Sequence, residues 1–173
     1  MATSAELLVD GFGRIRENVT DVLDGLTPEQ LAYRIDAGAN PVSWLVWHLT
    51  RVQDDHLAAA FGVTQVWSSG NWAARFGLPA KMMDHGYGHS PAQVAAVAAA
   101  TASAELLTEY HEQTYAQTVK LVSEVSDPDL DRVVDKRWTP SVTLGVRLVS
   151  VLDDDMQHVG QAAYVRGIIL RRG

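Results

Sequence analysis

Apolar residues recur with the period of an α-helix in four long segments of this 173-residue chain. The segments cover about residues 4–25, 41–61, 90–125 and 143–170, and the third has a break near 99–102. Few stretches show the alternation of apolar and polar residues that is typical of a strand. The sequence therefore predicts an all-α fold, a four-helix bundle with long connections after the second and third helices.

Shorter elements are predicted between these segments. Thr27, Pro28 and Gln30 have the spacing of a capping box with proline in the first turn, which indicates a short helix there. Asn40 is expected to cap the second long helix, ahead of Pro41. A glycine-rich connection follows, with a short helix near 70–76, and residues 127–142 are expected to be irregular or extended.

The composition excludes several classes of protein. The length suits a single domain over residues 1–173, and 47% apolar with 20% charged residues is typical of a globular chain. A net charge of -7 argues against a nucleic-acid binder, which would normally present a basic face. The chain has no cysteine, so disulfides, thiolate metal ligands and a cysteine nucleophile are all excluded.

Targeting signals are also absent from the sequence pattern. No apolar run reaches the roughly 18–20 residues that are needed to span a bilayer. The first residues lack the basic start and apolar block of a signal peptide. We therefore expect a cytoplasmic protein without a membrane partner.

Three aspartates interrupt the last apolar segment, in the stretch LDDDMQHVGQ at residues 152–161. Asp154 and His158 are four residues apart, so they share one face of a helix. His158 lies on the predicted apolar seam and Asp154 about 40° from it. That seam consists of Leu144, Leu148, Val151, His158, Ala162, Val165 and Ile169. A carboxylate beside an apolar core is costly unless it is paired, and a divalent cation would pair it.

The second long helix offers a third ligand. His48 shares a face with Leu45, Leu49 and Val52, which should look into the bundle. His48, Asp154 and His158 would form a metal site with one open position, as catalytic sites do. The simpler alternatives are a hydrogen-bonded core histidine and a solvated Asp/His pair.

The remaining aspartates, histidines and aromatic residues receive more ordinary interpretations. Asp153 and Asp155 are expected to face solvent or to pair with Arg147 or another cation, and a supporting role beside His48 is an alternative. The other histidines are predicted not to be ligands: His56, His85, His89 and His111. The large aromatic residues are predicted to lie in the core or at interfaces: Trp44, Trp47, Trp67, Trp72, Trp138, Tyr87 and Tyr164.

Four stretches of the chain carry a resemblance to a known family. They are NPVSWLVWHLTRVQDDH, WSSGNWAARFGLP, GYGHSPAQVAAV and DDDMQHVGQAAYVRG. Together they resemble the DinB-like superfamily, and most of all its actinobacterial mycothiol S-transferases, relatives of the mycothiol-dependent maleylpyruvate isomerase. The resemblance implies a four-helix bundle that holds zinc or nickel at the positions of His48, Asp154 and His158. Many members have histidine in place of Asp154 and the isomerase branch has glutamate, so this chain has a shorter carboxylate than the isomerases.

The resemblance also implies an activity. It is that of a metal-dependent S-transferase that conjugates mycothiol to electrophiles in detoxification. A free thiol with a pKa near 8.5 is mostly protonated at neutral pH, and a divalent metal deprotonates it. Arg147 is predicted to anchor a carboxylate or sugar hydroxyl of the thiol, and Gln161 to bond the metal-bound group or a ligand. For both, a surface ion pair or a core hydrogen bond is the alternative.

Other functions fit the same residues. One is a thiol-dependent isomerase or a metal-dependent hydrolase on the same scaffold, since a fold does not determine a reaction. Another is a non-catalytic, stress-related bundle that binds a metal or ligand. A homodimer is also expected, because the connections carry aromatic residues.

Overall fold

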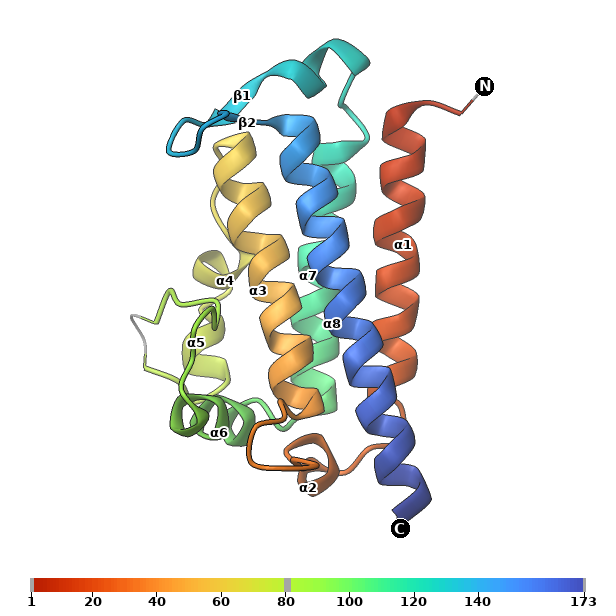
Figure 1. Cartoon of the computed structure of the whole chain (residues 1–173), viewed down its shortest axis with the longest axis vertical. Helices are drawn as coiled ribbons and strands as arrows, with labels where there is room; N and C mark the ends of the chain where they lie inside the picture. The colour runs from red at the N-terminus through yellow and green to blue at the C-terminus, as the bar shows by residue number, and fades with distance from the viewer. Residues whose placement is uncertain (1, 80–81, 173) are drawn as a thin grey trace.

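Four long helices surround one apolar core in the computed structural model, which describes residues 2–79 and 82–172 (Figure 1). These helices are α1 (Ser4–Leu23), α3 (Val42–Phe61), α7 (Ala104–Val122) and α8 (Leu144–Arg172). The bounds of α1, α3 and α8 fall within a few residues of the first, second and fourth predicted segments, and α7 is the later part of the third. The prediction of an all-α four-helix bundle is confirmed.

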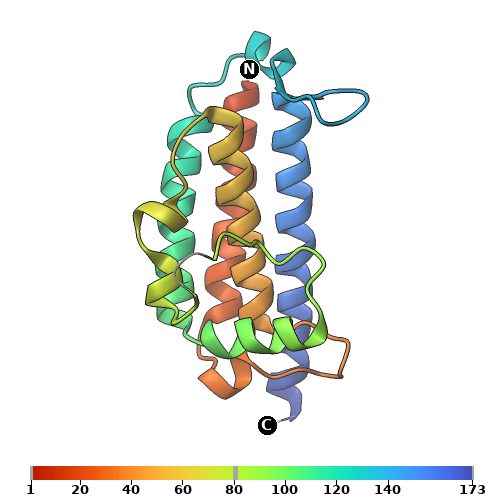
Figure 2. The ribbon, with the colours of Figure 1, turned by 90° about the vertical axis from the view of Figure 1, so that its left-hand side faces the viewer.

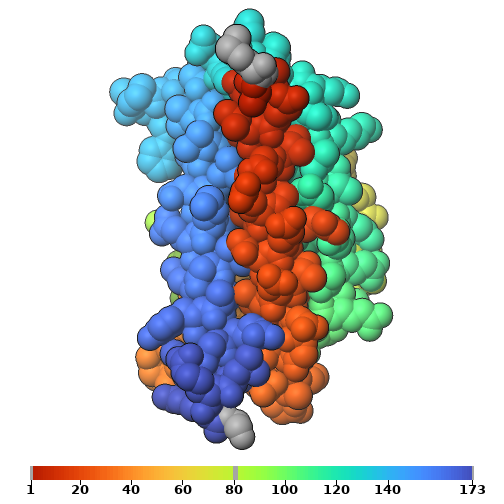
Figure 3. All heavy atoms as spheres, turned by 90° about the vertical axis from the view of Figure 1, so that its right-hand side faces the viewer, coloured from red at the N-terminus to blue at the C-terminus, as the bar shows by residue number. Residues whose placement is uncertain are grey.

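The four helices form a ring in which each contacts two neighbours. α8 packs against α1 and α3, and α7 packs against the same two helices. α1 therefore lies between α8 and α7 along the length of the molecule (Figure 3). In Figure 1 α1 and α8 run downward while α3 and α7 run upward. α3 and α8, which carry the candidate ligands, are thus antiparallel neighbours.

The first long connection returns the chain from the end of α3 to the start of α7. It contains α4 (Val66–Ser69), α5 (Trp72–Arg75) and α6 (Pro91–Ala100). α5 is the short helix expected near 70–76, α6 is the first part of the predicted segment 90–125, and α4 was not predicted. The chain between α5 and α6 crosses in front of α3 and reaches toward α8 (Figure 2). The predicted break near 99–102 is confirmed, because α6 ends at Ala100 and α7 begins at Ala104.

The second long connection contains a small hairpin at the start of α8. A 3-10 helix at Asp127–Asp131 precedes β1 (Val133–Asp135), which pairs antiparallel with β2 (Val142–Thr143). This agrees with the irregular or extended crossing predicted for residues 127–142. The hairpin brings Asp135 to within reach of Arg147, one turn into α8.

The helix caps agree with the sequence in one place and differ in another. Thr27 and Gln30 form the predicted capping box of α2 (Pro28–Leu31). The predicted cap at Asn40 is wrong, because Pro41 is the N-cap residue of α3 and no side chain caps it. Pro41 has extended backbone angles, as the start of a helix requires.

Small residues let α1 and α8 approach closely. α1 continues through Gly11, and a Cβ atom added there would lie 3.1 Å from Cδ2 of Leu152 on α8. The core between the helices is built from buried leucine, valine, isoleucine and aromatic side chains. None of the helices in the described residues is long and apolar enough to cross a membrane.

Candidate metal centre

His48 is held at the contact between α3 and α8. Its side chain is buried, and its ring stacks on the indole of Trp44 with 4.6 Å between the ring centres. Its Nδ1 atom makes a short hydrogen bond with the backbone carbonyl of His85. A carbonyl oxygen can only accept, so Nδ1 carries the hydrogen and Nε2 keeps a free lone pair.

His158 on α8 has the same arrangement. Its Nδ1 lies 2.8 Å from the backbone carbonyl of Asp154, so this nitrogen also donates and Nε2 is left free. The rings of His48 and His158 meet edge to face with 4.6 Å between their centres. Both histidines therefore have the tautomer in which Nε2 can bind a metal ion.

Asp154 completes the cluster. One ligand atom from each of His48, Asp154 and His158 lies within 4.8 Å of the others, and this is the one such group of three among residues 2–79 and 82–172. Oδ2 of Asp154 is buried and lies 3.3 Å from Nδ1 of His158, whose hydrogen the Asp154 carbonyl accepts. Within the described residues this oxygen has no other hydrogen-bond partner. A buried carboxylate oxygen of this kind suits a cation.

The charge states favour the forms that bind metals. Burial lowers the pKa of His48 to about 4, so its imidazole is neutral at pH 7. Burial alone would raise the pKa of Asp154, but the hydrogen bond and charge of His158 lower it, which leaves a carboxylate. Burial likewise opposes protonation of His158, yet its bonds to Asp154 raise its pKa above the ordinary value. A proton would therefore compete with a cation at His158.

Two imidazole nitrogens and one carboxylate fit a divalent transition metal. Zinc accepts this donor set, and nickel accepts imidazole. Three protein ligands would leave a coordination position for a further molecule. The predicted triad is thus assembled in the structure, from α3 and α8.

A buried ion network holds the loop that contacts His48. Arg51, one turn after His48, is fully buried, and its guanidinium donates to the backbone carbonyls of Met83 and Asp84. The same group donates to Asp54 at 3.4 Å and to the hydroxyl of Tyr110 at 3.2 Å. Because Asp84 precedes His85 directly, Arg51 fixes the position of the carbonyl that His48 bonds.

Gly86 allows the loop to lie flat on α3. Its φ is +96°, and an added Cβ atom would lie 2.9 Å from Trp44 and 3.0 Å from Nδ1 of His48. Only glycine fits at this position. The sequence analysis missed the roles of Arg51, His85 and Gly86. The one available signal was the short spacing between His48 and Arg51, which indicates a shared helix face.

Comparison with known proteins gives the family. The sequence matches the family model of mycothiol S-transferases over residues 7–170. The chain belongs to the mycothiol S-transferase family. Its structure is similar to the crystal structure of a conserved protein from Enterococcus faecalis, with 29% identity, a TM-score of 0.85, and coverage of 98% of this chain and 99% of that chain. No curated protein matches.

The structure has a cavity on each side of the triad along α3 and α8. One, here called the hairpin pocket, has a volume of about 430 Å³ and reaches from α3 to the β1–β2 hairpin. It is lined by Asp55, His56, Ala59, Ala60, His85, Val134, Asp135, Lys136, Arg137 and Arg147. The other, here called the loop groove, has a volume of about 550 Å³ and is lined by Ile35, Gly38, Ala39, Asn40, Leu45, Gly160, Gln161, Tyr164 and Val165.

These cavities separate the two predicted thiol-binding residues. Arg147 lies in the hairpin pocket and binds Asp135 at 3.2 Å. Gln161 is exposed and lines the loop groove, one turn beyond His158. Neither contacts the triad through a recorded hydrogen bond, so their roles in binding remain predictions.

The three aspartates have three different environments. Asp153 is exposed and accepts from Gln157 at 2.8 Å. Asp155 is fully buried, and neither of its oxygens has a partner among the described residues. The predicted pairing with Arg147 is wrong, because Arg147 pairs with Asp135. The supporting role beside His48 is also wrong, because the carbonyl of His85 fills it.

The predicted seam of α8 is correct except near the aspartates. Asp155 and Val159 are buried, whereas His158 is only partly so. In a helix with 3.6 residues per turn, the buried face that contains Val151 also contains positions 155 and 159. The predicted seam therefore lacked Asp155 and Val159, which lie on the buried face.

The other aromatic residues divide into two groups. Trp44, Trp47, Trp67 and Trp72 are buried, as predicted. Trp138, Tyr87 and Tyr164 are exposed, so the prediction of a core position is wrong for these three residues. A position at an interface stays a prediction for them. His56 and His85 line the hairpin pocket, and His89 bonds Asp84 at 2.8 Å.

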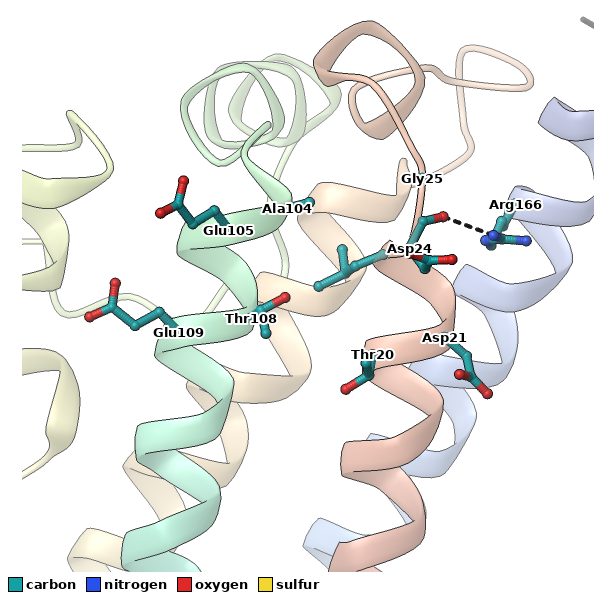
Figure 4. Close-up of a pocket in the computed structure, with 10 residues that line it drawn as sticks. Thr20, Asp21, Asp24, Gly25, Ala104, Glu105, Thr108, Glu109 and Arg166 are labelled. Carbon is teal, nitrogen blue, oxygen red and sulfur yellow. Dashed lines mark hydrogen bonds between the residues drawn. The ribbon is translucent and has the colours of Figure 1, made fainter.

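A cavity larger than either the hairpin pocket or the loop groove lies away from the triad. Its volume is about 800 Å³, and it lies where the end of α1 meets the start of α7 and the last turns of α8 (Figure 4). Its walls carry Asp21, Asp24, Glu105 and Glu109, and Arg166 donates to the Asp24 carbonyl. Unlike the hairpin pocket and the loop groove, it has no lining residue on α3, the helix that carries His48, so volume alone does not identify the site.

Proposed function

We propose that this protein is a metal-dependent S-transferase that conjugates mycothiol to electrophiles, with a role in detoxification. The observation that carries the proposal is the cluster of His48, Asp154 and His158, in which both histidines keep Nε2 free. Membership of the mycothiol S-transferase family supports the thiol and the type of reaction. Zinc is the expected ion and nickel the alternative.

The three side chains would hold the ion, and their surroundings would keep them in the binding form. A divalent cation at this site would lower the pKa of a bound thiol, so that sulfur reacts as a thiolate. His48 stays neutral because it is buried, and its tautomer is fixed by the His85 carbonyl. Asp154 supplies the one negative charge among the three ligands.

The two cavities suggest how two substrates bind. A transferase must hold a thiol and an electrophile at the same time, and the triad has a cavity on either side along α3 and α8. Gln161 in the loop groove would bond a hydroxyl of the thiol. Arg147 in the hairpin pocket would bond an acidic or hydroxyl group of either substrate.

Turnover of mycothiol with monobromobimane tests the function. We expect conjugation by the purified protein, loss of conjugation after treatment with a chelator, and recovery when zinc or nickel is returned. Asp154→Asn should lose activity, while the matched variant Asp153→Asn, at the exposed neighbouring position, should retain it. Undiminished turnover by metal-free protein would contradict the proposal. Metal binding without turnover would favour a non-catalytic binding bundle.

We also propose that the protein is a homodimer. Exposed apolar side chains on α8, among them Val149, Met156 and Tyr164, are available for a contact. Sedimentation velocity at micromolar concentration measures the state directly. A single species with the mass of one chain would contradict the dimer.

A further inference from the structure

The hairpin pocket lies next to the triad along both helices that form it. His56 is about two turns after His48 on α3, and Arg147 is two turns before Asp154 on α8, a distance of roughly 10 Å along the helix axis. Because α3 and α8 are antiparallel, both steps lead in the same direction, toward the hairpin. His85 joins the two sites, since its carbonyl bonds His48 while its ring lies 5.8 Å from that of His56.

The lining of this pocket is basic within an acidic protein. Lys136, Arg137 and Arg147 face two carboxylates, Asp55 and Asp135, while the whole chain carries a net charge of -7. Asp135 binds both arginines, at 2.9 Å and 3.2 Å. Asp55 accepts from Gln65 at 2.7 Å. The charged residues of the lining therefore sum to a net charge of +1.

The guanidinium of Arg147 has N–H donors that are not used by Asp135, and the side chain is held in place by its partly buried surroundings. Its side chain is only 15% exposed, and Asp135 fixes it through one nitrogen. In the described part of the chain no other hydrogen bond to its guanidinium is recorded, although the group carries five N–H donors. Nδ1 of His85 is likewise buried without a partner among these residues. The pocket thus offers a ligand the free donors of a cation that is held in place.

We propose that the hairpin pocket binds a carboxylate of the electrophilic substrate, about 10 Å from the sulfur-binding position. The inference rests on the proposed function, because it assumes that a thiol occupies the triad. A carboxylate matches the fork of an arginine in shape and charge. Mycothiol carries no carboxylate, so the electrophile supplies it.

A series of N-substituted maleimides tests the proposal on the metal-loaded protein with mycothiol. In this reaction a bond forms from sulfur to one alkene carbon, and the other carbon takes up the proton that the thiol released. Each maleimide carries an alkyl chain of graded length that ends in a carboxylate or in the matching primary amide. We expect kcat/KM to favour the acid by about tenfold at the chain length that reaches Arg147. Equal rates for acid and amide at every length would overturn the proposal.

Substitutions of the pocket residues test whether the preference for the acid over the amide arises in the hairpin pocket. Arg147→Gln should remove it and Arg147→Lys should keep part of it, while Asp135 remains paired with Arg137 in both. Lys136→Gln changes an exposed residue of the same pocket and should reduce the preference without risk to the fold. Arg14→Gln, a matched loss of charge at an exposed residue of α1 paired with Asp10, should leave it unchanged. Survival of the full preference in Arg147→Gln would contradict the assignment, because the acid would then bind elsewhere, as on the metal.

Two further experiments complete the test. The first distinguishes whether the thiol or the electrophile supplies the carboxylate, and the second distinguishes failure of the proposed pocket from failure of the proposed function. With N-acetylcysteine and its amide as thiols, a preference for the acidic thiol would overturn the assignment to the electrophile. Calorimetric binding of the unreactive succinimide analogues, acid against amide, needs no turnover. Acid-selective binding that Arg147→Gln abolishes, in a protein without transferase activity, would uphold the pocket while refuting the function. Transferase activity without acid preference would refute only the pocket.

Discussion

Nδ1 of His48 donates its hydrogen to the backbone carbonyl of His85, which lies in the connection between α5 and α6. This bond joins a helix of the bundle to a loop that the helical pattern of the sequence does not describe. It fixes the ring and its tautomer, so that Nε2 faces the cluster formed with Asp154 and His158.

The three clustered side chains should each be needed for metal. His48→Ala, Asp154→Ala and His158→Ala should each lower the affinity for zinc at least about a hundredfold, because losing even an outer partner of a ligand costs about 10–100-fold. The bundle should stay folded, because its core is built from apolar side chains that do not depend on the three ligands. Asp154→His should keep the metal, because it preserves the i, i+4 pair. Metal content per chain measures this, with Asp153→Ala as the unaffected control.

The loop should control metal affinity without supplying a ligand. Arg51→Lys removes the fork that holds the Met83 and Asp84 carbonyls, and Gly86→Ala pushes the same loop off α3. Both should lower zinc affinity about 10–100-fold, as measured by competition with a chelating dye. The Nδ1–H signal of His48 in imidazole nitrogen NMR should weaken in both.

Arg34→Lys is the matched control for these loop variants. Arg34 also holds a loop through backbone carbonyls, those of Ala37 and Ala39, but does not contact His48. Its substitution should leave zinc affinity and the His48 signal unchanged. Equal effects of Arg51→Lys and Arg34→Lys would show that general loosening, and not the position of His85, sets the affinity.

Asp155 should make the protein less stable as pH rises. Burial, with a smaller contribution from the charge of Asp154, raises the pKa of Asp155 well above its ordinary value of 3.8. The folded state then holds a proton that the unfolded state loses, so stability falls from about pH 4 upward until the folded pKa is reached. Asp155→Asn should be more stable at pH 7 by about 1–3 kcal/mol.

Urea unfolding at pH 4 and pH 7 measures this effect. The gain from Asp155→Asn should shrink at pH 4, where a substantial fraction of the carboxyl of the unfolded chain is itself protonated. Asp153→Asn, at an exposed position on the same helix, should change stability by less than about 0.5 kcal/mol at both values. A pH-independent gain would mean that Asp155 does not titrate in the folded protein as expected.

His111 should make the protein sensitive to acid. Burial, with the nearby charge of Arg16, lowers the pKa of His111 from 6.5 to about 4. Between about pH 6.5 and pH 4, His111 is protonated in the unfolded state but not in the folded state. The stability of the folded state therefore falls as pH decreases through this range. The loss reaches at most about 3 kcal/mol from this group. In His111→Gln the difference in unfolding free energy between pH 7 and pH 4.5 should be smaller, and an unchanged difference would contradict the prediction.

The sequence by itself determined the local structure. The helical period placed four helices, Thr27 and Gln30 placed a capping box, and the i, i+4 spacing placed Asp154 beside His158. These features depend on residues close together in the chain, so their physics is visible in the sequence. The third member, His48, was found because its neighbours form an apolar face.

Only the tertiary structure decided which polar groups meet across the bundle. The aspartates 153, 154 and 155 look alike in sequence, yet the rotation of α8 against its neighbours exposes the first, places the second in the cluster and buries the third. The contacts of Arg147 with Asp135 and of Arg51 with the His85 loop join distant segments through side chains and backbone carbonyls. A local pattern carries no information on such contacts, because they depend on how helices and connections pack in space.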